Sequence, residues 1–126
     1  HMRGTPQTMK NLTDYSNIFS EMVSYFSKKI EILQNRGVND IIIDPGFGFS
    51  KTIEQNYYLL DNMQHFQLLD KPLLAGISRK SMIYKKLGIT PEESLPETIR
   101  LNKIALEKGA SILRVHDVKE AVDLIK

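Results

Sequence analysis

The feature that most constrains the fold is an alternation of short apolar runs with longer stretches of helical periodicity. The apolar runs, at 39–44, 73–77 and 111–115, are typical of buried parallel strands. Around them, apolar residues recur every three or four positions, which is the spacing of one helix face. Repeated units of this kind predict an α/β protein with a parallel sheet and right-handed crossovers.

Helix boundaries are indicated by capping residues, glycines and prolines. We expect Thr13 or Asp14 to cap the first helix, Gly37 to end it, and Asp117 to cap the last. Pro96 is expected to separate a short turn from the helix that follows it. The predicted helices span 14–36, 53–67, 81–87, 97–108 and 118–126.

Two architectures fit this order, a doubly wound sheet and a barrel. Both place chemistry at the carboxyl ends of the strands. A complete (β/α)8 barrel needs roughly 250 residues, and this chain of 126 residues is about half of one.

Composition excludes several classes of protein. The length predicts one domain over 1–126, and the net charge of +2 gives no reason to expect nucleic acid or membrane binding. There is no cysteine, so disulfides are impossible, which fits a cytoplasmic protein. No apolar run reaches the roughly 18 residues of a membrane span, and we expect no secretory signal.

Three polar clusters follow the three predicted strands, at 44–51, 78–81 and 114–117. Adjacent parallel strands would bring these clusters into one basin. Side chains alternate along a strand, so Arg114 and His116 are expected on the same side and Val115 on the other. An arginine can hold a phosphate through two parallel N–H bonds, so this pair predicts an anion site.

Each of these residues also has a purely structural interpretation. Asp44 could simply start a turn before Pro-Gly, and Phe49 could belong to the core. Lys80 could be a solvated or helix-capping residue, and His116 could form a structural pair with Asp117. Three polar clusters at three successive strand ends are harder to explain as turns alone.

Four segments resemble motifs of the dihydropteroate synthases, a family of pterin-binding enzymes. They are HMRGTPQTM at 1–9, DPGFGFSK at 44–51, GISRKS at 76–81 and RVHDVKE at 114–120, in the family's order and spacing. The resemblance implies that 1–126 is the C-terminal half of a (β/α)8 TIM barrel, from the loop after strand 5 to the start of helix 8. Glu97 departs from the family, which usually has glycine before the equivalent of Thr98.

The resemblance implies an enzyme that joins dihydropterin methyl pyrophosphate to p-aminobenzoate and releases pyrophosphate. Asp44 is then expected to bind the pterin, and Lys80 to contact the pterin near the incoming amine. Arg114 and His116 are expected to hold the pyrophosphate, so that Lys80, Arg114 and His116 are the catalytic residues.

The same resemblance assigns three further substrate-binding residues. Phe49 and Ser81 are expected to border the p-aminobenzoate pocket, and Arg3 to approach the pterin. Gly76 leaves room for a flat ring. Without a ligand, the carboxylate of Asp44 and the ammonium of Lys80 are expected to approach as an ion pair.

The resemblance also implies a Mg²⁺ ion, whose ligand is not in this chain, so no metal ligand is predicted here. The chain alone is expected to be inactive, and its open sheet edges favour a homodimer or other self-association. Two alternatives stay open: a pterin-dependent methyltransferase relative, which has no pyrophosphate to hold, and a non-catalytic half-barrel.

Overall fold

The computed structural model describes residues 1–126, and its strands are shorter than the sequence predicts. Strand β1 (Leu74–Ala75) pairs in parallel with β2 (Ile112–Leu113). The expected strand at 39–44 is not formed as such, because only Ile43 pairs, through a single parallel bridge to Leu73. The three extended segments nevertheless lie side by side in sequence order and run parallel, as predicted.

Two prolines explain why the first strand is reduced to one bridge. Ile43 donates its N–H to Pro72 O and accepts from the N–H of Leu74. The next parallel bonds along this ladder would need N–H donors at Pro45 and Pro72, and proline has none. The ladder therefore cannot extend in either direction from Ile43.

Helix α1 (Ile18–Asn35) starts later than predicted. Its cap is Asn17, whose side chain accepts from the N–H of Ser20 at 3.0 Å, and neither Thr13 nor Asp14 caps it. Tyr15, on the predicted apolar stripe, instead reaches outside the helix and donates its hydroxyl to Ser50 O.

The predicted helix at 53–67 is divided in two. Helix α2 (Ile53–Asp61) starts with a capping box between Thr52 and Gln55, and the 3₁₀ helix η2 (Met63–Leu69) follows. The break is at Asn62, whose side-chain amide donates to Tyr58 O. Such side-chain bonds offer the backbone an alternative to the regular helix.

The second half of the chain follows the predictions more closely. Helix α3 (Ser81–Leu87) has the predicted bounds and ends at Gly88. The 3₁₀ helix η3 (Glu92–Ser94) leads into α4 (Leu95–Glu107), which begins before Pro96 because proline is tolerated in a first turn. Helix α5 (Val118–Ile125) follows β2, and the short 3₁₀ helix η1 (Met9–Asn11) lies near the start of the chain.

Glu97, the departure from the family pattern, does not disturb α4. Its carboxylate forms an ion pair with Arg100 on the same helix, at 2.6 Å. The neighbouring Thr98 is buried and accepts a hydrogen bond from the N–H of Arg79 at 3.2 Å. The helix thus keeps its contact with the loop after β1.

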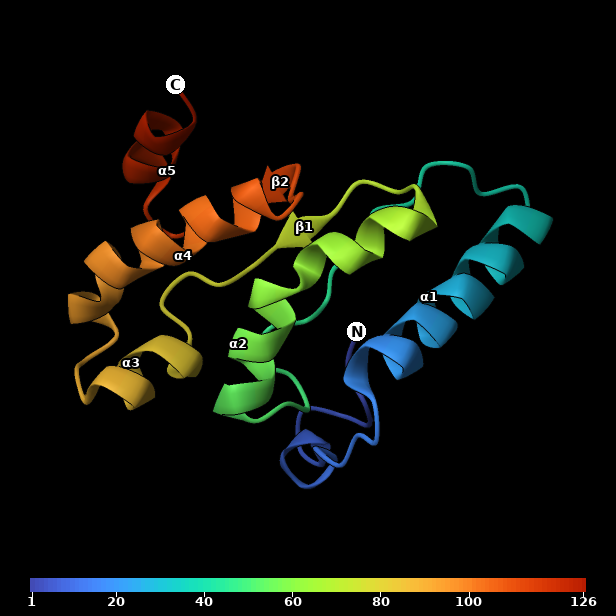
Figure 1. Ribbon diagram of the computed structural model, residues 1–126, viewed down its shortest axis with the longest axis horizontal. Helices are drawn as coiled ribbons and strands as arrows, with labels where there is room; N and C mark the ends of the chain where they lie inside the picture. Colours follow the sequence, from blue (N-terminus) through green and yellow to red (C-terminus); the bar gives the residue numbers. More distant parts are fainter.

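One apolar core connects the helices to the extended segments. It includes Met22 of α1, Leu60 of α2, Ala75 of β1 and Ala105 of α4, all fully buried. Figure 1 shows α1 and α5 at opposite ends of the molecule, with β1 and β2 between them. Helix α5 has no buried residue. No helix combines the length and the apolar character that crossing a bilayer requires.

Candidate functional site

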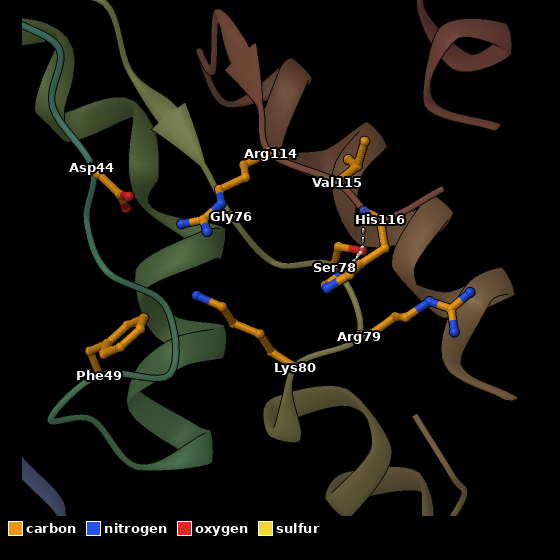
Figure 2. Close-up of a pocket in the computed structure, with 9 residues that line it drawn as sticks. All are labelled: Asp44, Phe49, Gly76, Ser78, Arg79, Lys80, Arg114, Val115 and His116. Atoms are coloured by element: carbon orange, nitrogen blue, oxygen red, sulfur yellow. Dashed lines mark hydrogen bonds between the residues drawn. The ribbon is translucent and has the colours of Figure 1, made fainter. Parts of the chain in front are cut away.

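One cavity of about 430 Å³ opens at the carboxyl ends of the three extended segments (Figure 2). All three polar clusters contribute to it. Its lining residues are Asp44, Phe49, Gly76, Ser78, Arg79, Lys80, Arg114, Val115 and His116. The structure therefore brings together five of the seven residues that the sequence analysis assigned to substrates.

Asp44 starts the first loop and faces the cavity. Its Oδ1 accepts the N–H of Gly46 at 2.8 Å, so the turn-forming role considered for Asp44 is real. That bond uses one carboxylate oxygen, and Asp44 belongs to none of the ion pairs of the chain. The second oxygen remains for a ligand.

Lys51 holds this loop from inside, and the sequence analysis did not assign it a role. Its ammonium donates to Gly46 O at 3.1 Å and to Phe49 O at 2.9 Å, and the residue is only 8% exposed. Burial lowers the pKa of Lys51 to about 8. Asn56 adds a second anchor, because its Oδ1 accepts the N–H of Gly48 at 2.8 Å. Lys51 is the last residue of the segment 44–51, and nothing in the sequence around it indicates that its side chain is buried.

Gly46 is the position in this loop that least tolerates a side chain. Its φ is +75°, and an added Cβ would lie 1.9 Å from His1 O. Gly46→Ala is therefore expected to lower the free energy of unfolding by about 2 kcal/mol, from left-handed strain plus the clash. Gly88→Ala is the control, since φ is +65° there but nothing lies within 4 Å. Urea unfolding should show the smaller loss for Gly88→Ala, and equal losses would contradict the contact with His1.

Lys80 reaches across the cavity toward the first loop. Its ammonium donates to Phe47 O and lies 4.7 Å from the centroid of the Phe49 ring. Burial lowers the pKa of Lys80, with Arg114 acting in the same direction and Asp44 opposing it. The expected ion pair with Asp44 does not form, because the carbonyl of Phe47 takes the ammonium instead.

Arg114 extends into the same space from the end of β2. Its backbone N–H is fixed by Ala75 O at 3.0 Å, and its side chain takes part in no ion pair. Below it, a Cβ added to Gly76 would be 3.9 Å from both the Arg114 Cβ and the Lys80 Nζ. Gly76 therefore leaves open the space between the two cations. Figure 2 shows Asp44, Lys80 and Arg114 pointing toward this space.

His116 is held by the loop after β1. Its Nδ1 is 2.9 Å from Ser78 Oγ, and its backbone N–H donates to the same oxygen at 3.2 Å. Asp117 occupies the capping position of α5 but makes no capping bond. Its carboxylate accepts instead from Arg79, at 2.6 and 3.0 Å, because the bidentate ion pair is the stronger partner.

Ser81 lies outside the first cavity and lines a second one, of about 290 Å³, beside it. The second cavity shares Phe49, Arg79 and Lys80 with the first. Its other lining residues are Met9, Phe47, Gly48 and Tyr84. The two cavities together could receive a ligand with two parts.

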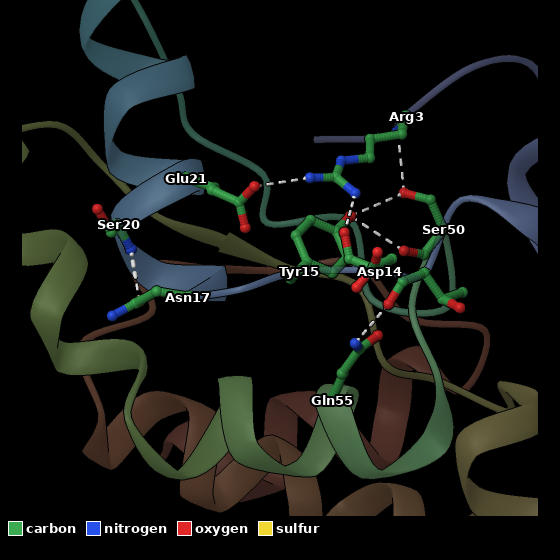
Figure 3. A network of polar contacts seen from close by, with 9 residues as sticks. Arg3, Asp14, Tyr15, Asn17, Ser20, Glu21, Ser50 and Gln55 are labelled. Atoms are coloured by element: carbon green, nitrogen blue, oxygen red, sulfur yellow. Dashed lines mark hydrogen bonds and ion pairs between the residues drawn. The ribbon is translucent and has the colours of Figure 1, made fainter.

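Arg3 lines neither cavity, unlike the other residues predicted to bind substrate. Its guanidinium pairs with Glu21, donates to Asp14 O and lies 3.8 Å from the centroid of the Tyr15 ring. Its backbone N–H donates to Ser50 Oγ (Figure 3). In this structure Arg3 joins the first loop to Asp14 and Tyr15 before α1 and to Glu21 within it. This position gives no support to the predicted contact with a pterin.

The chain contains no group of three or more His, Asp or Glu side chains that could hold a metal ion. Around the cavity, cations outnumber the single carboxylate that faces it. These residues do not fit a Mg²⁺ site by themselves, and we assign no step to a metal.

Comparison with known proteins identifies the relatives of this chain. A family described as "Pterin binding enzyme" matches residues 1–116. The dihydropteroate synthase of Escherichia coli (strain K12) is 41% identical over 128 residues, covering 100% of this chain and 45% of that protein.

Two solved structures have the same fold over nearly the whole chain. A Yersinia pestis dihydropteroate synthase in complex with a sulfonamide drug has a TM-score of 0.95 at 35% identity, covering 99% of this chain and 46% of that one. A Xanthomonas albilineans dihydropteroate synthase with 4-aminobenzoic acid has a TM-score of 0.89 at 32% identity, covering 99% and 45%. The chain spans less than half the length of the curated relatives that it matches. It belongs to the pterin-binding enzyme family and is a homologue of the dihydropteroate synthases.

Proposed function

We propose that this chain is the C-terminal half of the (β/α)8 barrel of a dihydropteroate synthase. In this proposal further segments complete the barrel, and we call the resulting protein the complete enzyme. It condenses dihydropterin methyl pyrophosphate with p-aminobenzoate and releases pyrophosphate. The observation that carries the proposal is one cavity that holds a free carboxylate oxygen on Asp44, the Arg114 guanidinium, which forms no ion pair, and the His116 ring, which Ser78 holds.

Asp44 and Lys80 are assigned to the pterin. The 2-amino and N3–H groups of a pterin form an edge with two donors, which a carboxylate matches with acceptors. Gly76 supports this assignment because its missing side chain leaves space for a flat ring between Lys80 and Arg114. The ammonium of Lys80 is held over the Phe49 ring, near the second cavity, where the amine of p-aminobenzoate would enter.

Arg114 and His116 are assigned to the pyrophosphate. The carbon–oxygen bond from the pterin methylene to the pyrophosphate breaks, and both electrons leave with the anion. Cationic and N–H groups placed where this negative charge grows lower the barrier without reorganising during the reaction. The amine nitrogen then bonds to the methylene carbon and loses a proton. The chain acts by position and charge.

Phe49 and Ser81 are assigned to p-aminobenzoate in the second cavity. The Xanthomonas relative was solved with 4-aminobenzoic acid and the Yersinia relative with a sulfonamide drug. We therefore expect a sulfonamide to compete with p-aminobenzoate for the second cavity of the complete enzyme.

The test is pyrophosphate release by the complete enzyme from dihydropterin methyl pyrophosphate. Release should require p-aminobenzoate and yield dihydropteroate, and a sulfonamide should inhibit it. A protein that binds pterin but forms no dihydropteroate would instead fit a methyltransferase relative or a non-catalytic barrel. The 126-residue chain alone is expected to show no turnover.

Two further expectations remain predictions, a cytoplasmic location and self-association. The second has some support in the open face of α5, where Val118 and Ile125 are each 63% exposed. Exposed apolar side chains that gather on one helix often mark a surface that a partner covers.

A further inference from the structure

Two neighbouring residues after β1 each contact one of two neighbouring residues after β2. Ser78 bonds twice to His116, at 2.9 and 3.2 Å. The next residue, Arg79, donates from Nε and Nη2 to both carboxylate oxygens of Asp117, at 3.0 and 2.6 Å. We call these four residues the loop clamp. It joins the two loops that carry Lys80 and Arg114.

The backbone of Arg79 is shaped for this contact. Its φ is +54°, in the left-handed region that residues other than glycine rarely adopt. The backbone N–H of Arg79 donates to Oγ1 of the buried Thr98 of α4 at 3.2 Å. Figure 2 shows the result: Lys80 extends into the cavity while Arg79 turns away from its centre. An uncommon conformation that is held by a buried partner points to a role beyond chain reversal.

Arg79 and Arg114 differ in what remains free for a ligand. Arg114 is unpaired, whereas the Arg79 charge is neutralised by Asp117, whose side chain is 18% exposed. The Arg79 hydrogen bonds lower the pKa of the Asp117 carboxyl, so the pair stays ionised at neutral pH. Arg114 is thus the anion ligand, and Arg79 is available to support the loop that carries His116.

We propose that Arg79 and Asp117 are positioning residues that hold His116, through Ser78, in the orientation that binds the departing pyrophosphate. The bond from Ser78 engages Nδ1 and leaves Nε2 of His116 for the anion. Without the ion pair, the loop after β2 can shift and take His116 from its place. This inference rests on the proposed function.

The experiment uses the complete enzyme and the variant Asp117→Asn. Asp117 lines neither cavity, so its effect must act through other residues. We expect kcat and the affinity for pyrophosphate, measured as product inhibition, each to fall about tenfold, since a displaced group loses much of its effect. The KM for p-aminobenzoate should stay unchanged.

Glu97→Gln is the matched control. Glu97 forms the same bidentate contact with Arg100, at 2.6 and 2.9 Å, but on the outside of α4. Its loss should leave all three kinetic constants unchanged. Thermal unfolding of both variants shows whether the fold persists. If Asp117 had a purely structural role, Asp117→Asn would lower Tm without changing the affinity for pyrophosphate.

A second measurement reads His116 directly. Nitrogen-15 chemical shifts distinguish the two ring nitrogens of a histidine, and His116→Gln assigns the signals. Asp117→Asn should change the His116 shifts and should reduce their response to added pyrophosphate. Unchanged shifts and unchanged kinetics in Asp117→Asn would overturn the clamp while leaving the proposed function standing. A wild-type enzyme that releases no pyrophosphate would instead overturn the proposed function, and the clamp inference with it.

Discussion

Replacing Arg114 with alanine is expected to lower the turnover of the complete enzyme about a hundredfold, because it removes a preorganised donor to the leaving anion. Arg114 is exposed at the end of β2 and belongs to no ion pair, so the change opens no core cavity and leaves no partner unpaired. Its backbone N–H still bonds to Ala75 O in the variant. The free energy of unfolding should therefore change little.

Steady-state kinetics of Arg114→Ala, with the unfolding curve measured beside it, tests this expectation. Arg36→Ala is the control, since Arg36 is exposed, lies just beyond α1 and lines neither cavity. The loss should appear mainly in kcat, because the charge of the pyrophosphate grows as the bond breaks. Wild-type turnover in a folded Arg114→Ala enzyme would remove Arg114 from the pyrophosphate site.

Asp44→Asn is expected to weaken pterin binding by the complete enzyme on the order of a hundredfold. In Asp44 the Oδ1 accepts from the N–H of Gly46 at 2.8 Å. Oδ1 of the asparagine can accept the same hydrogen bond, so the turn should be kept. The second oxygen becomes an amide that faces the donors of the pterin. A donor buried against a donor costs about 1–3 kcal/mol, and the lost bond to a charged acceptor adds to this.

Calorimetric titration with a pterin, and circular dichroism to check folding, measure this effect. Asp40→Asn is the matched control, because Asp40 is an exposed aspartate four residues earlier in the same segment. It should bind the pterin as the wild type does. If Asp44→Asn bound equally well, Asp44 would be only the turn-forming residue that the sequence also allowed.

The contacts between loops show where sequence reasoning reached its limit. The expected pair of Asp44 with Lys80 was wrong because a backbone carbonyl, Phe47 O, lies where the ammonium ends. The expected cap by Asp117 was wrong because its carboxylate accepts hydrogen bonds from Arg79, thirty-eight positions earlier, instead of from the backbone of α5. Neither partner is marked by residue type or spacing, since both contacts depend on how two loops approach.

The amino-acid sequence was enough to predict the order of the parallel extended segments and helices, most helix boundaries in the second half, and the polar clusters that meet at one edge of the sheet. These follow from local periodicity, caps and chain direction. Three features could be seen only in the folded chain: Lys51 is buried beneath the first loop, Arg3 lies outside the cavities, and the segment 39–44 forms a single β-bridge. The physical reason is common to all three. Burial, ion pairing and strand pairing all depend on groups that are far apart in the chain. Pro45, for example, ends its strand because the next bond to β1 would need a backbone N–H that proline lacks.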